Sequence, residues 1–244
     1  MTNPDLRGKT ILITGAARRI GRGLAIACAK AGADVIIHHG HSEQDALQVQ
    51  REIIALGRQA WILSSDLEKP AGVAQLISDS NQIQPLYAVV NSAAIFKPLS
   101  LEETSLSDWE RHLAINLTAP FLLSQAFANQ LSKGATGRIV NLLDWRALRP
   151  GADHFPYTIS KAGLAALTAA LAVALAPGIP VNGLALGAIL SPSDRPASPE
   201  IIKNVPAGEW GKLEYVEEAL LFLLTCPAYI TGEIIHVDGG RHLI

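Results

Sequence analysis

Tyr157 and Lys161 stand four residues apart and are the pair in this chain best suited to acid–base chemistry. Side chains at this spacing share one face of a helix, so the ammonium group of the lysine can lie close to the phenol. An isolated phenol titrates near pH ~10, and a neighbouring cation favours its ionised form. We therefore expect Lys161 to lower the pKa of Tyr157 toward the range that is useful for proton transfer.

Asp144 stands thirteen residues before Tyr157, at the end of the strand-like segment 138–144. A hydroxyl group at such a position can donate to a carbonyl oxygen that becomes an alkoxide, whereas an ionised carboxylate would repel that charge. A carboxylate can instead accept hydrogen bonds from ring and exocyclic N–H groups. Asp144 therefore favours a nitrogen heterocycle with a C=N bond over a ketone as the substrate.

The first thirty residues indicate a nucleotide site. The apolar run 9–13 leads into Thr14-Gly15-Ala16-Ala17-Arg18-Arg19-Ile20-Gly21, and a small-residue helix follows over 24–29. Strand, glycine turn and helix in this order are typical of a dinucleotide-binding unit. Its glycines permit the turn and close packing, and its helix N-terminus offers free N–H groups to a pyrophosphate.

The residues that follow the second predicted strand, 33–38, favour NADP(H) over NAD(H). An acidic residue usually holds the ribose hydroxyls of NAD at this point. Here the chain continues as His38-His39-Gly40-His41-Ser42, with no carboxylate before Glu43, while Arg18 and Arg19 lie in the glycine turn. A solvated loop is the alternative role for these histidines. No metal site is expected, because no Cys or acidic cluster with ligand spacing accompanies them.

Composition narrows the function classes. The 244 residues are 49% apolar with a net charge of −2, which suits one α/β domain and gives no indication of nucleic-acid binding. Cys28 and Cys226 lie in apolar contexts, which predicts buried thiols in a reducing, cytoplasmic compartment. The polar N-terminus lacks a signal-peptide pattern. The apolar stretch 162–176 is shorter than the ~20 residues of a membrane span, so we expect a buried helix and no membrane insertion.

Strand and helix patterns alternate along the chain and predict a Rossmann-type doubly wound parallel sheet of about seven strands, with helices on both faces, in one domain over 1–244. Ligands of such sheets bind beyond the carboxyl ends of the strands. The Pro- and Ser-rich segment 188–212 follows the sixth strand, and we expect it to be a lid over the substrate. The predicted strands are 9–13, 33–38, 59–63, 86–90, 137–143, 179–184 and 233–237, and the predicted helices include 43–56, 71–83, 106–113, 119–131 and 215–225.

The chain resembles the short-chain dehydrogenase/reductase family over nearly its full length. The resemblance is carried by Thr14-Gly15, Asn91-Ser92-Ala93, Asn116, the Tyr157/Lys161 pair and Val237-Asp238-Gly239-Gly240. It implies catalytic roles for Asp144, Tyr157, Lys161 and Asn116. Together with the arguments above, it implies NADP(H) contacts at Gly15, Arg18, Arg19, Ile20, Gly21, His38, His41, Ser42, Asp66, Leu67, Asn91, Ser92, Ala93, Tyr157, Lys161, Gly187 and Ile189.

Three departures from the common family pattern look like the pteridine reductase branch, which includes the dihydromonapterin reductases. Arg19 replaces the usual middle glycine of the turn, Asp144 replaces the catalytic serine, and Phe96 follows Asn91 by five residues. In that branch the aromatic residue stacks on one face of the pterin. The resemblance therefore implies a dihydropterin substrate, such as dihydromonapterin, dihydrobiopterin or dihydrofolate. The implied substrate-binding residues are Arg19, Phe96, Asp144, Tyr157 and Trp210.

Two other functions stay open at this point. A carbonyl reductase of the same family, acting on a ketone, a sugar or a 3-oxoacyl thioester, would need Asp144 to be protonated or bypassed. A non-catalytic NADP-binding sensor would bind the cofactor without turnover, although such a protein would not need Asn116, Tyr157 and Lys161. Relatives are commonly homotetramers, so the resemblance also implies a homotetramer built in part on the helix that carries Tyr157.

Overall fold

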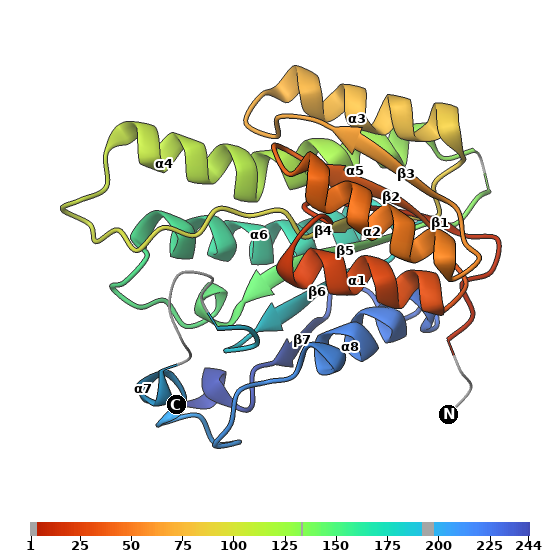
Figure 1. Cartoon of the computed structure of the whole chain (residues 1–244). Coiled ribbons are helices and arrows are strands. Elements are labelled where there is room, and N and C mark those ends of the chain that lie inside the picture. Colours follow the sequence, from red (N-terminus) through yellow and green to blue (C-terminus); the bar gives the residue numbers. More distant parts are fainter. Residues whose placement is uncertain (1–3, 133, 192–197) are drawn as a thin grey trace.

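The computed structural model describes residues 4–132, 134–191 and 198–244 and contains one seven-stranded sheet (Figure 1). All neighbouring strands pair in parallel, in the order β3-β2-β1-β4-β5-β6-β7. The predicted fold class is confirmed, and each predicted strand matches an observed strand to within two residues. The strands are β1 (Thr10–Ile13), β2 (Asp34–His39), β3 (Ala60–Ser64), β4 (Ala88–Asn91), β5 (Arg138–Asp144), β6 (Val181–Leu186) and β7 (Ile234–Val237).

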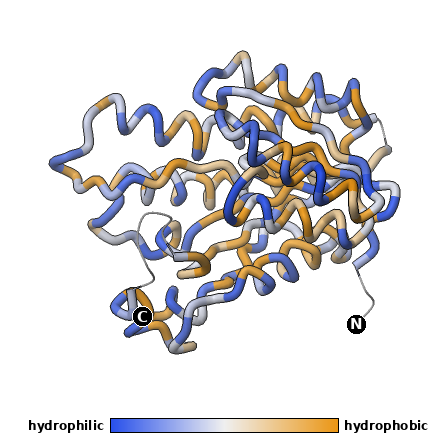
Figure 2. The backbone as a smooth tube through the Cα atoms, in the orientation of Figure 1, coloured by the Kyte–Doolittle hydropathy of each residue, from blue (hydrophilic) through white to orange (hydrophobic). Residues whose placement is uncertain are grey.

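The central strands are apolar because both faces of the sheet are covered. Every residue of β1, β2, β4 and β6 is buried, and the strands form the apolar centre of the backbone in Figure 2. His39 is among these buried residues, so the solvated-loop alternative was wrong for this histidine: it is the last residue of β2 and pairs with Ser64.

Helices cover both faces of the sheet, and the sheet separates two large apolar cores (Figure 1). One core contains buried side chains of α1 (Arg19–Lys30), α2 (Glu43–Ala55) and α8 (Leu213–Thr225). The other contains side chains of α3 (Pro70–Ile83), α5 (Ala119–Gln130) and α6 (Phe155–Ala174). Strand order reverses at β1, which lies between β2 and β4. A crevice for ligands is expected at such a point, beyond the carboxyl ends of these strands.

A π-helical turn over Ala114–Thr118 joins α4 (Leu106–Leu113) to α5. The sequence predicted both helices but treated them as separate segments. The hydroxyl oxygen of Ser105 caps the first turn of α4 by accepting a 3.1 Å hydrogen bond from the amide of Asp108. The wider π turn places Asn116 on the buried side of the helix, where its side chain is fully enclosed.

Helix α6 has 20 residues, which is longer than the apolar stretch on which the sequence prediction relied. Its length and its mean hydropathy of 1.4 would allow it to cross a membrane, by these two criteria alone. The helix covers the sheet, however, and buries Leu164, Thr168 and Ala172 along its inner face. Tyr157 and Lys161 also lie on this buried face, so α6 packs as a core helix of the fold.

The segment 188–212 is partly helical. A short helix, α7 (Pro199–Ile202), lies within it, and residues 192–197 of the predicted lid lie outside the described residues. Two 3₁₀ turns, Trp145–Ala147 after β5 and Arg241–Leu243 at the C-terminal end, were not predicted either. Both of these turns contact each other at the carboxyl side of the sheet.

Candidate active site

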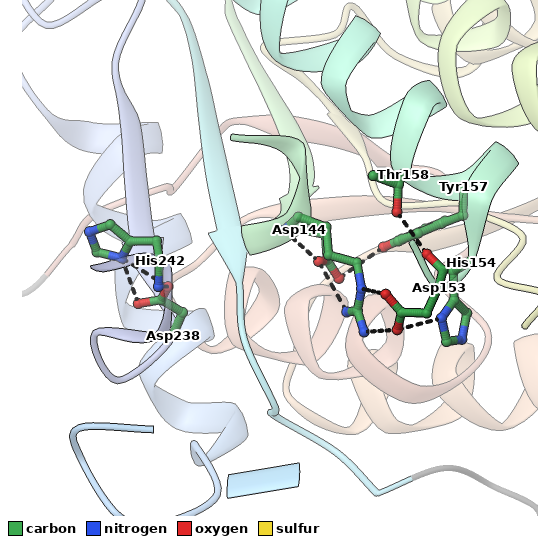
Figure 3. Close-up of polar contacts among 8 residues, drawn as sticks. Asp144, Asp153, His154, Tyr157, Thr158, Asp238 and His242 are labelled. Atoms are coloured by element: carbon green, nitrogen blue, oxygen red, sulfur yellow. Dashed lines mark hydrogen bonds and ion pairs between the residues drawn. The ribbon is translucent and has the colours of Figure 1, made fainter. Parts of the chain in front are cut away.

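Asp144 and Tyr157 meet beyond the carboxyl end of β5. The hydroxyl of Tyr157 donates a 3.2 Å hydrogen bond to Oδ2 of Asp144, and Figure 3 shows the two side chains pointing toward each other from β5 and α6. Asp144 ends the strand, and Tyr157 lies in the first turn of the helix. The structure thus brings together the two residues for which the sequence predicted a joint chemical role.

Arg146 holds the second carboxylate oxygen of Asp144. Its backbone amide donates to Oδ1 at 2.9 Å, and its guanidinium Nη1 lies 3.5 Å from the same oxygen. Its Nη2 donates to Asp153 at 2.7 Å, and the ring of His154 lies 3.0 Å from the same carboxylate. Arg146 lowers the pKa of Asp153 to about 2. The Arg146 guanidinium is therefore charged and shared between two carboxylates at the edge of the site.

Phe96 connects the two ends of this group of side chains, because it contacts both His154 and Tyr157. Its aromatic ring stacks on His154 with centroids 4.0 Å apart and lies edge-on to Tyr157 at 4.6 Å. His154 has a left-handed φ of +52°, a conformation uncommon outside glycine, and it is the residue directly before α6. About half of Phe96 remains exposed, so the ring retains area for a flat ligand.

The expected effect of Lys161 on Tyr157 was wrong. Burial and the charge of Asp144 raise the pKa of Tyr157 well above its ordinary value, because both disfavour the phenolate. The ammonium group of Lys161 lies 5.8 Å from the centre of the phenol ring and donates instead to the carbonyl oxygen of Leu142 at 2.6 Å. Burial lowers the pKa of Lys161 to about 8, and Asp144 partly opposes that effect.

Asn116 links the helix layer to the strand end beside Phe96. Its amide nitrogen donates to the carbonyl of Ile95 and to the hydroxyl of Ser160, and its oxygen accepts from the amide of Ile95 at 2.9 Å. Ser160 directly precedes Lys161 on α6. The side chain of Asn116 therefore fixes the backbone next to Phe96 and the helix face that carries Lys161.

The predicted glycine turn is present between β1 and α1. Gly15 has a φ of +65°, and a Cβ atom there would lie 2.9 Å from the Cα atom of Ala93. A Cβ atom on Gly21 would overlap the carbonyl oxygen of Gly15. No side chain of the preceding residue, Arg18, caps the start of α1. The turn is thus a close cradle with free helix N–H groups, which fits a pyrophosphate.

His38 is hydrogen-bonded to the backbone of this turn. The amide of Gly15 donates to Nδ1 of His38 at 3.2 Å, and the other ring nitrogen lies 3.1 Å from the carbonyl oxygen of Ser65. These partners require the tautomer with the proton on Nε2. Burial lowers the pKa of His38 to about 4. Both ring nitrogens serve the protein itself, so His38 can affect a cofactor only through the turn that it holds.

Thr14 ties the turn to the end of β4. Its hydroxyl oxygen accepts from the amides of Ser92 and Ala93, each at 3.0 Å. The side-chain nitrogen of Asn91 donates to Oδ1 of Asn141 at 2.8 Å, while the buried side-chain oxygen Oδ1 of Asn91 has no partner among the described residues. Buried polar groups are normally paired, so this oxygen remains available to a donor on a bound ligand.

The two arginines of the turn point to different partners. Arg18 pairs with Asp45 of α2 at 2.6 Å, an acidic neighbour that the sequence argument did not consider. Arg19, which has a φ of +51°, donates to the carbonyl oxygen of Ser191 at 3.0 Å. Arg19 therefore joins the glycine turn to the segment after β6.

The remaining predicted cofactor residues lie at other strand ends, except for Ile20, which lies in α1. His41 and Ser42 follow β2, and the side chains of Leu67 and Ile189 are buried in the two cores, which leaves only their backbone for a ligand. Asp66 follows β3 and pairs with Lys69. Ile20 packs against the first core, and a Cβ atom on Gly187 would lie 2.7 Å from Asp238 in the loop after β7.

Three residues of the site were missed. Arg146, Asp153 and His154 come from the irregular stretch between β5 and α6, where no periodicity marks a side chain as buried. For Arg146, the position two residues after Asp144 was the available signal. Trp210 was predicted to bind substrate. Among the described residues, its side chain makes no hydrogen bond or aromatic contact with Asp144, Tyr157 or Phe96.

Comparisons with known proteins identify the family of the chain. The family model described as Enoyl-(Acyl carrier protein) reductase matches residues 15–242. A 3-oxoacyl-[acyl-carrier-protein] reductase of Synechocystis sp. is 32% identical over 240 residues, covering 96% of this chain and 97% of that protein. A 2-dehydro-3-deoxy-D-gluconate 5-dehydrogenase of Bacillus subtilis is 31% identical, covering 97% of this chain and 95% of that protein.

A solved structure that is named for a different function has a similar level of identity. FolM alternative dihydrofolate reductase 1 of Brucella suis, crystallised with NADP, is 30% identical with a TM-score of 0.89, covering 97% of this chain and 96% of that one. The family match spans nearly the whole chain and includes the glycine turn, the Asn116 position and the Tyr157 helix. The chain therefore belongs to the short-chain dehydrogenase/reductase family.

Proposed function

We propose that this protein is an NADPH-dependent reductase that transfers hydride to a dihydropterin. The observation that carries the proposal is the carboxylate of Asp144, which accepts the hydroxyl of Tyr157 on one oxygen and the amide of Arg146 on the other. A carboxylate in this place can accept N–H groups of a pterin, whereas it would repel the oxyanion of a reduced ketone. The FolM structures among the similar proteins add support, because those proteins are named alternative dihydrofolate reductases.

NADP(H) is the cofactor that the family and the turn support. Several similar structures were crystallised with NADP or NADPH. The cradle at Gly15 and Gly21 fits a pyrophosphate, and the unpaired oxygen of Asn91 lies at the neighbouring strand end. We propose that Arg18 then exchanges Asp45 for a 2′-phosphate, since a doubly charged phosphate is the stronger partner. When bound, NADPH supplies the hydride.

The residues of the chain divide the remaining work. Tyr157 stays protonated at neutral pH because its pKa is raised, so its hydroxyl can donate a proton toward a ring nitrogen. Asp144 accepts ring or exocyclic N–H groups and thereby orients the substrate. Phe96 offers an exposed ring face for stacking. Asn116 and Lys161 hold the helix and strand ends that carry these groups.

A carbonyl reductase is the second candidate. It is favoured by the similar proteins named 3-oxoacyl-[acyl-carrier-protein] reductase and 2-dehydro-3-deoxy-D-gluconate 5-dehydrogenase. A protonated Tyr157 would serve as the proton donor to a carbonyl oxygen equally well. We propose a single domain, cytoplasmic location and a homotetramer for either activity, following the family resemblance.

The experiment that separates these functions is NADPH oxidation by the purified protein. Dihydrobiopterin, dihydromonapterin and dihydrofolate would be run beside ketones, sugar ketones and acetoacetyl thioesters. Turnover confined to dihydropterins supports the proposal. Turnover confined to carbonyl compounds refutes it and supports the second candidate, and cofactor binding with no turnover of any compound supports the sensor function.

A further inference from the structure

Trp145, the residue after Asp144, is flanked by two arginine side chains. The guanidinium carbon of Arg241 lies 4.4 Å from the centre of the indole ring, and that of Arg146 lies 4.8 Å away. Arg146 belongs to the turn after β5, and Arg241 begins the 3₁₀ turn at the C-terminal end. Two like charges on either side of one ring repel each other, and nearby anions are needed to offset that repulsion.

The two arginines differ in how many carboxylates they contact. Arg146 contacts both Asp144 and Asp153. Arg241 has no carboxylate within 4 Å in the part of the chain that the structure describes. Burial and the charge of Arg146 lower the pKa of Arg241, which is the direction expected for a cation without a direct partner. An arginine nevertheless stays charged at neutral pH.

An open cavity adjoins the unpaired guanidinium. Its volume is about 530 Å³, and it is lined by Trp145, Asn204, Arg241 and Ile244. The indole and the isoleucine supply apolar surface, while Arg241 and the amide of Asn204 supply donors. This composition suits an aromatic or apolar group that ends in an anion. Trp145 directly follows Asp144, and the charges of Asp144 and Asp153 act on the Arg241 guanidinium, so the cavity lies close to the strand end that carries Asp144.

We propose that Arg241, with Trp145 and Asn204, binds a carboxylate or phosphate carried by the substrate beyond the ring that Asp144 orients. The inference deepens the proposed function: it selects dihydropterins with an anionic substituent over those with a neutral side chain. A charge-assisted hydrogen bond in a partly buried site accounts for a preference of roughly tenfold to hundredfold.

The kinetic test compares dihydrofolate, which carries carboxylates, with dihydrobiopterin, which does not. We expect R241Q to raise KM for dihydrofolate at least tenfold and to change kcat/KM for dihydrobiopterin less than twofold. R241K should recover part of the loss, because it restores the charge without the planar donor pair. The matched control is R149Q, since Arg149 is a nearby exposed arginine that donates to His242 and does not line the cavity. Equal losses for both substrates in R241Q would overturn the inference.

A binding test decides the inference even if no dihydropterin is reduced. Calorimetry on the NADP-bound wild type would use p-aminobenzoylglutamate, its neutral diethyl ester and phenyl phosphate. At least tenfold tighter binding of one anion than of the ester, abolished in R241Q, supports the site and identifies its anion as a carboxylate or a phosphate. Equal affinity of the ester and both anions overturns the inference. Failure of all dihydropterin turnover, by contrast, refutes only the proposed reaction.

Discussion

The carboxylate of Asp144 sets the chemistry of the site in our proposal, and one substitution tests it. Asp144→Ser replaces an acceptor with the hydroxyl that favours carbonyl substrates. We expect dihydropterin turnover to fall at least ~10²-fold, the loss typical of a positioned group in proton transfer. The measurement is kcat for NADPH oxidation with dihydrobiopterin. NADPH affinity and the circular dichroism spectrum should remain those of the wild type, and unchanged dihydropterin turnover would contradict the role of Asp144.

Lys161 gives a prediction about stability and pH. Its folded pKa of about 8 is below its ordinary value of 10.5, so the folded protein binds fewer protons than the unfolded chain between these values. The contribution of Lys161 to the free energy of unfolding therefore rises with pH between pH 8 and 10.5. Relative to Lys161→Met, the wild type should gain about 3 kcal/mol between pH 7.5 and 10.5, at ~1.4 kcal/mol per pH unit.

The measurement is urea unfolding of both proteins at a series of pH values. Groups that titrate in both proteins cancel in the difference between their unfolding free energies. A difference that stays constant from pH 7.5 to 10.5 would show that the folded structure does not lower the pKa of Lys161.

The turn between β1 and α1 is the element whose packing is most exacting. A methyl group at Gly21 would overlap the carbonyl oxygen of Gly15 and push α1 away from the turn. We expect Gly21→Ala to lower the unfolding free energy by about 1–3 kcal/mol and to weaken NADPH binding at least tenfold, as measured by NADPH fluorescence. Gly178→Ala is the control, because a Cβ atom there meets only Leu175 at an ordinary 3.9 Å. Similar losses in both variants would argue against a special role for the turn.

The helices and strands could be predicted because their apolar residues follow regular patterns in the sequence. Apolar runs such as Ile11–Ile13 and Val35–Ile37 are typical of strands buried on both faces, and all seven were located. The π turn at Ala114–Thr118 could not be predicted, because its sequence continues the helical pattern on both sides. Its cause is tertiary: Asn116 is drawn to the backbone of Ile95 and to Ser160.

The candidate site was predictable where spacing carried the information. Asp144 and Tyr157 lie at the end of a strand and the start of a helix, so their meeting followed from the fold. Arg146 and His154 lie in an irregular connection, where contacts depend on backbone angles that a sequence does not reveal. The shift of the Tyr157 pKa was predicted with the wrong sign, because Lys161 bonds to Leu142 and burial dominates.

At the scale of the whole molecule, the two cores share one sheet, and we propose that the chain unfolds as one unit. Thermal denaturation should give a single transition, and its midpoint temperature should rise when NADPH is added. At a concentration of 100 Kd the stabilisation expected from binding is about 2.7 kcal/mol. Two separate transitions, of which only one responds to NADPH, would contradict a single domain over 1–244.

The proposed homotetramer leads to a prediction on the outer face of α6. Val173 is an apolar residue of this helix and is 82% exposed in the single chain. If α6 packs against another subunit, Val173→Glu places a charge in that contact and should reduce the assembly measured by light scattering. Glu218→Gln on α8 is a control that changes charge outside this face. A wild-type protein of 25.9 kDa in solution would refute the tetramer.

The neutral ring of His38 has a consequence for acid tolerance. Above pH 6.5 its hydrogen bonds to Gly15 and Ser65 do not change with pH, so the turn keeps one shape throughout the neutral range. Below 6.5 the unfolded chain gains a proton that the folded protein refuses until about pH 4. This single ring then lowers the unfolding free energy by ~1.4 kcal/mol per pH unit, or about 3 kcal/mol in total. Mild acid should therefore inactivate the enzyme by releasing its nucleotide turn.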